Sequence, residues 1–333
     1  MRKTIAAGLL SRSGFRPLLA RLLPWSGVVV LNYHRVGDGY ASLFDRGLWS
    51  ADADSFAQQI RFCKAQLDLI SPADLPTVLG KRRGRYGMIT FDDGYRDNYD
   101  VAFPILTAER VPATFFVATG FVDEPVVPWW DEIAWMVRSS PRDAIKLPDW
   151  LGSYSPLSFD KPDRERAVRT LLRAYKRMPG ERTAAYLDAV AQATGSGRCD
   201  AEAGRRLWMN WDMLRAMHAA GMTIGGHTIS HPILARESAQ RQREEILGCG
   251  ERLATEIGQP MRYFSYPVGG LSTFDNVTRS TLRDAGVRYA FSYYGGVRRF
   301  DGWDDYDVRR VPVEVDTSCE SFRSIISVPT LFA

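Results

Sequence analysis

The stretch Ile89-Thr90-Phe91-Asp92-Asp93-Gly94-Tyr95 combines a short apolar run with two adjacent carboxylates and a turn. The apolar run is typical of a buried strand, and the glycine marks a bend after it. Neighbouring side chains on a strand point to opposite faces, so Asp92 and Asp93 can share a site only if the chain bends at Gly94. We expect one carboxylate to bind a cation while the other takes a proton from a water. The alternative is a capping pair for a helix that begins near Tyr95, because aspartate is a preferred N-cap residue.

Short apolar runs alternate with segments of helical spacing on both sides of this stretch, and this pattern predicts an α/β fold with a parallel sheet closed into a barrel. From about 125 to 207 the pattern changes to helical segments interrupted by prolines, which we interpret as a helical insertion in one barrel domain, 27–333. The strands are expected at residues 28–34, 88–91, 112–119, the start of 222–232, 263–267, 289–293 and 308–315.

The composition is that of an ordinary globular protein. Over 333 residues, 45% are hydrophobic and 25% are charged, which is enough to bury a full core. The net charge of +4 is too small to indicate nucleic acid as a partner. The four cysteines are scattered and form no Cys-x-x-Cys pair, so a bound metal would need oxygen and nitrogen ligands.

Residues 1–26 form a basic amphipathic N-terminal segment. Its first residues imitate a signal peptide, but charged side chains interrupt the apolar run and no hydrophobic stretch of about 18 residues follows. Residues 5–23 are better explained as a helix that lies on an anionic membrane surface or packs on the domain. We therefore expect a cytoplasmic protein with peripheral membrane contact, and export to the cell envelope is the alternative.

Three of the four histidines, His34, His227 and His231, lie at expected strand ends, where parallel barrels gather their chemistry. The His-x-x-x-His spacing would bring His227 and His231 onto one side of a helical turn. Together with one carboxylate they supply three ligands and leave a position open for water, as a catalytic zinc site requires. The spare carboxylate of the aspartate pair could then act as general base.

Three motifs resemble, in order, the first three motifs of the polysaccharide deacetylases of carbohydrate esterase family four, the nodulation-factor deacetylase homology family. They are TFDDGY at 90–95, HTISHP at 227–232 and RYFSYPVG at 262–269. The resemblance covers roughly residues 27–315 apart from the insertion. It implies a distorted (β/α)7 barrel that removes N- or O-acetyl groups from carbohydrate. It also implies a divalent metal, commonly zinc, with cobalt, nickel or manganese as alternatives.

The resemblance implies roles for individual residues as well. Asp93, His227 and His231 would hold the metal, and Asp92 would be the base. Backbone N–H groups near Tyr95 would stabilise the oxyanion. Pro267, at the end of another strand, joins the residues expected at the substrate.

The chain departs from the family pattern in the third motif. Family members carry an arginine just after the aromatic residue of this motif, where it pairs with the base, and here Ser265 takes that place. Arg262, Arg309 or Arg310 could supply the guanidinium instead.

A second departure concerns the general acid. No histidine follows His231, so the late Leu-x-His motif of the family is absent. His34 resembles the permuted arrangement of the poly-N-acetylglucosamine deacetylases, in which the equivalent histidine lies on the first strand. Because the first and last strands of a closed barrel are neighbours, we predict that His34 protonates the leaving amine.

The expected reaction is hydrolysis of acetyl groups, most simply the N-acetyl group of a hexosamine, in a bacterial polysaccharide or oligosaccharide precursor. The expected partner is this acetylated glycan, with no nucleic acid. Four aromatic residues are expected either to stack on sugar rings or to belong to the core: Tyr95, Trp129, Trp130 and Tyr293.

Two other functions stay open. A catalytically inactive carbohydrate-binding barrel would explain the missing arginine of the third motif. A non-haem Fe(II) oxygenase also uses two histidines and a carboxylate, but such enzymes have an antiparallel double sheet and the second aspartate would be unexplained.

Overall fold

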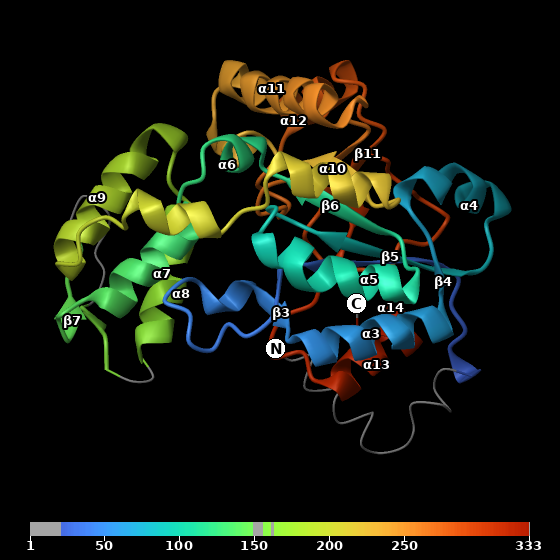
Figure 1. Cartoon of the computed structure of the whole chain (residues 1–333), viewed down its shortest axis with the longest axis horizontal. Helices are drawn as coiled ribbons and strands as arrows, with labels where there is room; N and C mark the ends of the chain where they lie inside the picture. Colours follow the sequence, from blue (N-terminus) through green and yellow to red (C-terminus); the bar gives the residue numbers. More distant parts are fainter. Residues whose placement is uncertain (1–20, 149–155, 161–162, 333) are drawn as a thin grey trace.

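Parallel strands form the centre of the molecule, and helices surround them (Figure 1). The computed structural model describes residues 21–148, 156–160 and 163–332. The strands of the main sheet run in the order β12-β11-β10-β9-β6-β5-β1-β13, and the short β4 (Asp68–Leu69) pairs with β5. Their bounds are β1 (Gly27–Tyr33), β5 (Arg85–Phe91), β6 (Ala113–Val117), β9 (Thr223–Gly226), β10 (Tyr263–Ser265), β11 (Tyr289–Ser292), β12 (Val308–Arg309) and β13 (Val311–Pro312).

The two ends of this sheet are joined by a single residue. β12 pairs with β11 and β13 pairs with β1, although only Arg310 separates β12 from β13 in the chain. The segment 308–312 therefore closes the sheet into a nearly complete barrel. If β12 and β13 are counted as one interrupted strand, the barrel has seven strands, and the predicted distorted (β/α) barrel is confirmed.

Side chains that point into the barrel change character along β1 and β5. On β1, Val28 and Val30 pack in a cluster with Met88 of β5, whereas the alternate residues of β1 pack in the larger cluster with the surrounding helices. Two residues further along, the same inward rows continue with Asn32 on β1 and Thr90 on β5, both fully buried. Because side chains alternate along a strand, the inward rows of these two strands are apolar at one end of the barrel and polar at the carboxyl end.

Helices that cover the barrel begin and end at recognisable signals. For example, α11 begins after Ser238, whose side chain accepts the N–H of Arg241, and ends at Gly258 in the left-handed conformation with φ 77°. The barrel helices are α3 (Ala53–Gln66), α4 (Leu75–Lys81), α5 (Phe103–Glu109), α6 (Thr119–Asp123), α10 (Trp211–Ala219), α11 (Ala239–Ile257), α12 (Asn276–Asp284), α13 (Cys319–Ser327) and α14 (Pro329–Phe332). A separate two-stranded sheet joins β2 (Arg35–Val36) to β3 (Trp49–Ala51).

A group of helices between β6 and α10 extends to one side of the barrel (Figure 1). It contains α7 (Trp129–Ser139), α8 (Asp163–Tyr175) and α9 (Thr183–Thr194), with a small hairpin of β7 (Ala144–Ile145) and β8 (Leu157–Ser158). These elements share a hydrophobic cluster of their own, distinct from the clusters of the barrel. We propose that residues 125–207 are an insertion within one barrel domain, and we refer to them as the insertion.

The predicted membrane-surface helix at residues 5–23 lies almost entirely outside the described residues. At its end, Leu22 and Leu23 are exposed. Among the residues that the structure describes, none of the helices has the length and apolar character that a bilayer crossing would need.

Candidate active site

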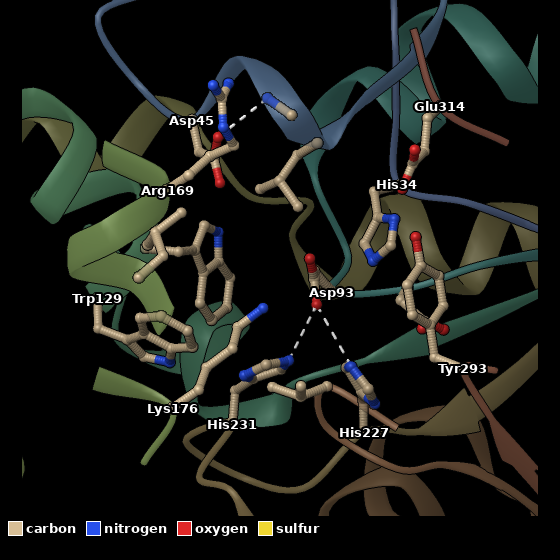
Figure 2. Close-up of a pocket in the computed structure, with 16 residues that line it drawn as sticks. His34, Asp45, Asp93, Trp129, Arg169, Lys176, His227, His231, Tyr293 and Glu314 are labelled. Atoms are coloured by element: carbon tan, nitrogen blue, oxygen red, sulfur yellow. Dashed lines mark hydrogen bonds and ion pairs between the residues drawn. The ribbon is translucent and has the colours of Figure 1, made fainter. Parts of the chain in front are cut away.

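A pocket of about 340 Å³ opens at the carboxyl ends of the barrel strands (Figure 2). Its size falls in the range of about 300–1,000 Å³ that is common for small-molecule sites. The barrel contributes one side of the pocket, and the insertion contributes the other. The barrel residues include His34, Asp92, Asp93, His227, His231, Val268, Tyr293 and Glu314, and the insertion residues are Trp129, Trp130, Arg169, Leu172 and Lys176.

Both aspartates of the TFDDGY stretch reach this pocket. Asp92 follows the inward row of β5, and the turn begins at Asp93 itself, which has φ 77°, before Gly94 at φ 92°. The chain therefore bends one residue earlier than the sequence predicts, and this bend brings the second carboxylate to the side of the first. Aspartate adopts this left-handed conformation more readily than most other non-glycine residues.

The carboxylate of Asp93 faces two imidazoles. Its Oδ1 lies 3.3 Å from Nε2 of His227 and 3.4 Å from Nε2 of His231, and all three side chains are buried. Nδ1 of His227 lies 2.7 Å from the carbonyl oxygen of Ser265, so this nitrogen donates. If the imidazole is neutral, the lone pair of Nε2 then faces the carboxylate, so the contact needs either a proton on Nε2 or a metal ion between the two atoms.

The three ligand atoms lie within 4.8 Å of one another. Two imidazole nitrogens and one carboxylate oxygen are the donor set of catalytic zinc and related divalent ions. Burial alone would raise the pKa of Asp93, but hydrogen bonding to His227 and His231 outweighs it and holds the pKa well below its usual range. The cluster therefore carries an anionic oxygen at neutral pH and fits a divalent metal.

The His-x-x-x-His segment does not form the helical turn that its spacing predicts. His227 and His231 lie on an irregular loop after β9, in which Thr228 has φ 68° and His231 has φ 57°. Two left-handed residues within five positions are incompatible with a right-handed helix. The prediction of a helical turn was wrong, although it correctly brought the two imidazoles together.

A buried carboxylate of α11 holds this loop in place. Glu245 is fully buried and accepts the backbone N–H groups of Ile229 and Ser230, both at 2.8 Å, and the hydroxyl of Ser230 at 2.6 Å. Arg241 pairs with the same carboxylate at 2.6 Å. The loop conformation is therefore fixed by a residue that the sequence analysis did not single out.

The other aspartate, Asp92, pairs with Arg310. The guanidinium donates two hydrogen bonds of 2.7 Å, one to each oxygen of the carboxylate, and a third of 2.7 Å to the hydroxyl of Ser265. Asn32 contacts the same carboxylate at 3.3 Å. Burial would raise the pKa of Asp92, but the charge of Arg310 outweighs it and the pKa is lowered. Asp92 is thus ionised and fixed in orientation.

Of the three arginines proposed to replace the missing one, only Arg310 reaches the aspartate. Arg262 is exposed, and Arg309 pairs with Asp307. The small side chain of Ser265 leaves room for the guanidinium, which enters from the segment that closes the barrel. The arginine beside Asp92 thus comes from the closing segment and not from position 265, where the expected pattern has it.

His34 lies across the pocket from the insertion, directly after β1 (Figure 2). Its ring contacts the ring of Tyr293, with 5.5 Å between their centroids. Its backbone is held by Ser50, which accepts the N–H of His34 at 3.1 Å, and by the side chain of Asn98, which donates to the carbonyl oxygen. His34, after the first strand, and Asp92 and Asp93, after the neighbouring strand, therefore line one cavity.

The expected aromatic contacts divide into two groups. Trp129 and Tyr293 line the pocket and are partly exposed, so both are available to a sugar. Tyr95 is fully buried and donates to Asp131 at 2.7 Å while it accepts from Nε1 of Trp130 at 2.7 Å. Of the two alternatives for Tyr95, the core position therefore holds, because the ring is buried in the contact between barrel and insertion.

Two other predicted substrate residues behave differently. Trp130 lines the pocket but is only 4% exposed, and its ring packs on His231 with 4.4 Å between centroids. Pro267 is buried and is not among the residues that line the pocket, where the next residue, Val268, takes its place. The sequence also gave no indication of Arg169 and Lys176, which reach the pocket from the insertion.

Comparison with known proteins gives one family and a set of related folds. The family model described as polysaccharide deacetylase matches residues 80–141 and 160–290, more than half of the chain. No protein among those with a curated description matches the chain.

Among solved structures, the deacetylase PplD of Streptococcus pyogenes has a TM-score of 0.58 at 17% identity, over 90% of this chain and 96% of that chain. IcaB of Ammonifex degensii has a TM-score of 0.55 at 20% identity, over 93% and 98% of the two chains. A de-N-acetylase of Aggregatibacter actinomycetemcomitans has a TM-score of 0.57 at 16% identity, over 89% and 98%. At these identities the three structures support the fold.

Proposed function

Because the chain belongs to the polysaccharide deacetylase family and is a carbohydrate deacetylase, we propose that it removes the N-acetyl group of a hexosamine in a metal-dependent reaction. One observation carries this proposal. A buried Asp93–His227–His231 cluster lies beside a second aspartate that Arg310 keeps ionised, and His34 faces the same cavity. We propose an acetylated bacterial polysaccharide or oligosaccharide precursor as the substrate.

In this proposal Asp93, His227 and His231 hold a divalent metal, with zinc as the first choice. Such an ion, when bound, lowers the pKa of a water toward ~7 and polarises a carbonyl oxygen. Asp92 accepts the proton of the attacking water, and its pairing with Arg310 keeps the carboxylate pointed at the pocket.

The remaining steps need a proton donor. Water adds to the acetyl carbon, the carbon–nitrogen bond breaks, and acetate leaves. His34 delivers a proton to the departing nitrogen, which leaves as the free amine of the hexosamine. Its position across the pocket from the insertion, beside Tyr293, supports this role.

The two alternatives lose their main arguments. The inactive barrel was suggested by the missing arginine, and Arg310 now occupies the position beside Asp92. The oxygenase would require an antiparallel double sheet, whereas the main sheet is parallel.

The deciding experiment measures acetate release from a panel of N- and O-acetylated glycans with the metal-free, zinc and cobalt forms. We expect release of acetate from an N-acetylhexosamine substrate only when metal is present, and loss of both metal and activity in His227→Ala. His218→Ala, which alters a histidine on α10 outside the pocket, is the matched control. Equal acetate release with and without metal would contradict the proposal, and sugar binding without acetate release in any form would favour the inactive barrel.

A further inference from the structure

The insertion presents a cationic face to the active-site pocket. Arg169, Leu172 and Lys176 all line it, and their spacing of three and seven residues places them on one side of α8 and its continuation. Figure 2 shows the Lys176 side chain extending into the pocket from the same side as Trp129. Its ammonium lies 5.9 Å from the centroid of the Trp129 ring.

Among the described residues, neither cation is part of an ion pair. Within the described part of the chain, no carboxylate lies within ion-pair distance of Arg169 or Lys176, whereas other arginines of the insertion, such as Arg138 and Arg198, are paired with glutamates. Both side chains are exposed where they line the open pocket. Because neither cation is held in an ion pair, both are free to donate hydrogen bonds to an anion that binds between them and the pocket floor.

The other charges of the pocket leave this face positive. Four carboxylates line the pocket, but Asp92 is paired with Arg310 and Asp93 belongs to the cluster that fits a metal. Asp45, labelled beside Arg169 in Figure 2, accepts the neutral backbone N–H of Gly47 at 2.9 Å and offsets one of the two positive charges, so the face keeps an excess of one. The last carboxylate, Glu314, comes from the barrel beyond β13, together with His34 and Tyr293, and not from the insertion.

We propose that Arg169 and Lys176 form an anion subsite, which binds a phosphate or carboxylate group carried by the glycan next to the N-acetylhexosamine that is deacetylated. This inference rests on the proposed function and adds the substrate class, an acidic glycan. A guanidinium and an ammonium are the usual protein partners of phosphate and carboxylate oxygens. Leu172 and Trp129 beside them supply apolar surface for the sugar ring.

The test compares kcat/KM of the zinc-loaded full chain for three soluble substrates: N-acetylglucosamine 1-phosphate, a disaccharide of N-acetylglucosamine and glucuronic acid, and the neutral methyl glycoside of N-acetylglucosamine. We expect one of the two anionic substrates to be preferred over the neutral one by at least about tenfold. The preferred substrate identifies the anion as phosphate or carboxylate.

The double variant Arg169→Gln/Lys176→Gln should lose most of this preference. The control is Arg166→Gln/Arg173→Gln, which removes two charges at the same seven-residue spacing from a side of α8 that does not line this pocket. This control should keep the preference for the anionic substrate. The inference is overturned if the wild type treats all three substrates alike, or if the Arg169/Lys176 variant keeps the preference.

A binding measurement separates this inference from the proposed function. If no substrate releases acetate in any metal form, the proposed function fails. The affinity for N-acetylglucosamine 1-phosphate, measured by calorimetry for the Arg169/Lys176 variant and the control, then still tests the anion subsite. Binding at least about tenfold weaker in the Arg169/Lys176 variant than in the control supports it, and equal binding overturns it.

Discussion

At the scale of single residues, Arg310 determines the state of the proposed base. Its guanidinium is fully buried and satisfies both oxygens of Asp92, while its Nε donates to the carbonyl oxygen of Ser292 at 3.0 Å. Removal of one partner from a buried ion pair leaves an uncompensated charge, which costs about 3–5 kcal/mol.

Arg310→Ser should therefore lower the free energy of unfolding by about 3 kcal/mol and abolish most acetate release, because the buried carboxylate of Asp92 loses its counter-charge. Urea unfolding and an acetate assay measure the two effects. Arg309→Ser, next in the chain but with a side chain 41% exposed, is the control and should change little.

Adding Ser265→Arg to Arg310→Ser offers a guanidinium from β10 instead of the closing segment, and part of the lost activity should return. If Arg310→Ser alone keeps wild-type activity, Asp92 does not need the arginine and its assignment as base is wrong.

A second residue-scale prediction concerns His34. His34→Ala should lower turnover by at least about tenfold, since positioned proton donors contribute about 10²–10⁴-fold. Metal content, measured on the same sample, should stay at the wild-type level because His34 is not part of the Asp93–His227–His231 cluster. A smaller decrease in turnover would exclude His34 as the general acid.

At the scale of elements, the strand ends explain how much of the site the sequence could predict. Period-two alternation carries the inward rows of β1 and β5 from apolar residues to Asn32 and Asp92, and this pattern is local. The choice of Arg310 among three arginines was not predictable, because its pairing with Asp92 spans 218 residues and depends on how the barrel closes.

The loop between β9 and α11 shows another limit of the sequence. The spacing of His227 and His231 predicts a helical turn, but Glu245 of α11 binds successive backbone N–H groups and stabilises a left-handed loop instead. Such a tertiary contact overrides the local pattern, and nothing in the spacing reveals it. The cationic face of α8 was hidden for the same reason, since only the packing of the insertion shows which side faces the pocket.

Glu245→Gln should weaken zinc binding about 10–100-fold, because the amide provides one acceptor where the carboxylate provides two and the ligand loop loses its fixed conformation. Competition with a chelator measures the change. Glu244→Gln, at a half-exposed position on the same helix, is the control. Unchanged zinc affinity in Glu245→Gln would show that the loop is rigid without this contact.

At the scale of the whole molecule, a buried polar network joins the insertion to the barrel. Asp131 of α7 accepts the hydroxyl of Tyr95 at 2.7 Å and the backbone N–H of Asp45 at 2.9 Å. Arg35 stacks on the Tyr95 ring at 4.4 Å from its centroid and pairs with Asp97 at 2.8 Å. This network fixes the insertion, which carries Lys176, against the barrel.

Burial raises the pKa of Asp131 from its ordinary value of 3.8 to about 7. Between these values the folded protein holds a proton that the unfolded chain has released, so the contribution of this group to stability falls as the pH rises. From pH 5 to pH 8 the loss should be about 2–3 kcal/mol.

Urea unfolding of the wild type and of Asp131→Asn at pH 5 and pH 8 measures this effect. The free energy of unfolding of Asp131→Asn should not show this decrease between pH 5 and pH 8. Asp100→Asn, at an exposed position, should show the same decrease as the wild type. If Asp131→Asn loses stability between the two pH values as steeply as the wild type, Asp131 titrates normally.

The closing segment 308–312, which carries Arg310, also has a consequence for when the active site forms during synthesis of the chain. Because protein chains are made from the N-terminus, both aspartates and all the histidines leave the ribosome before residue 310. Until the segment 308–312 joins β11 to β1, the nascent chain has an open sheet, and Asp92, the proposed base, lacks its arginine. If Asp92 is the base, we therefore expect hydrolysis to begin only when the barrel is complete, and an unfinished chain to have no activity.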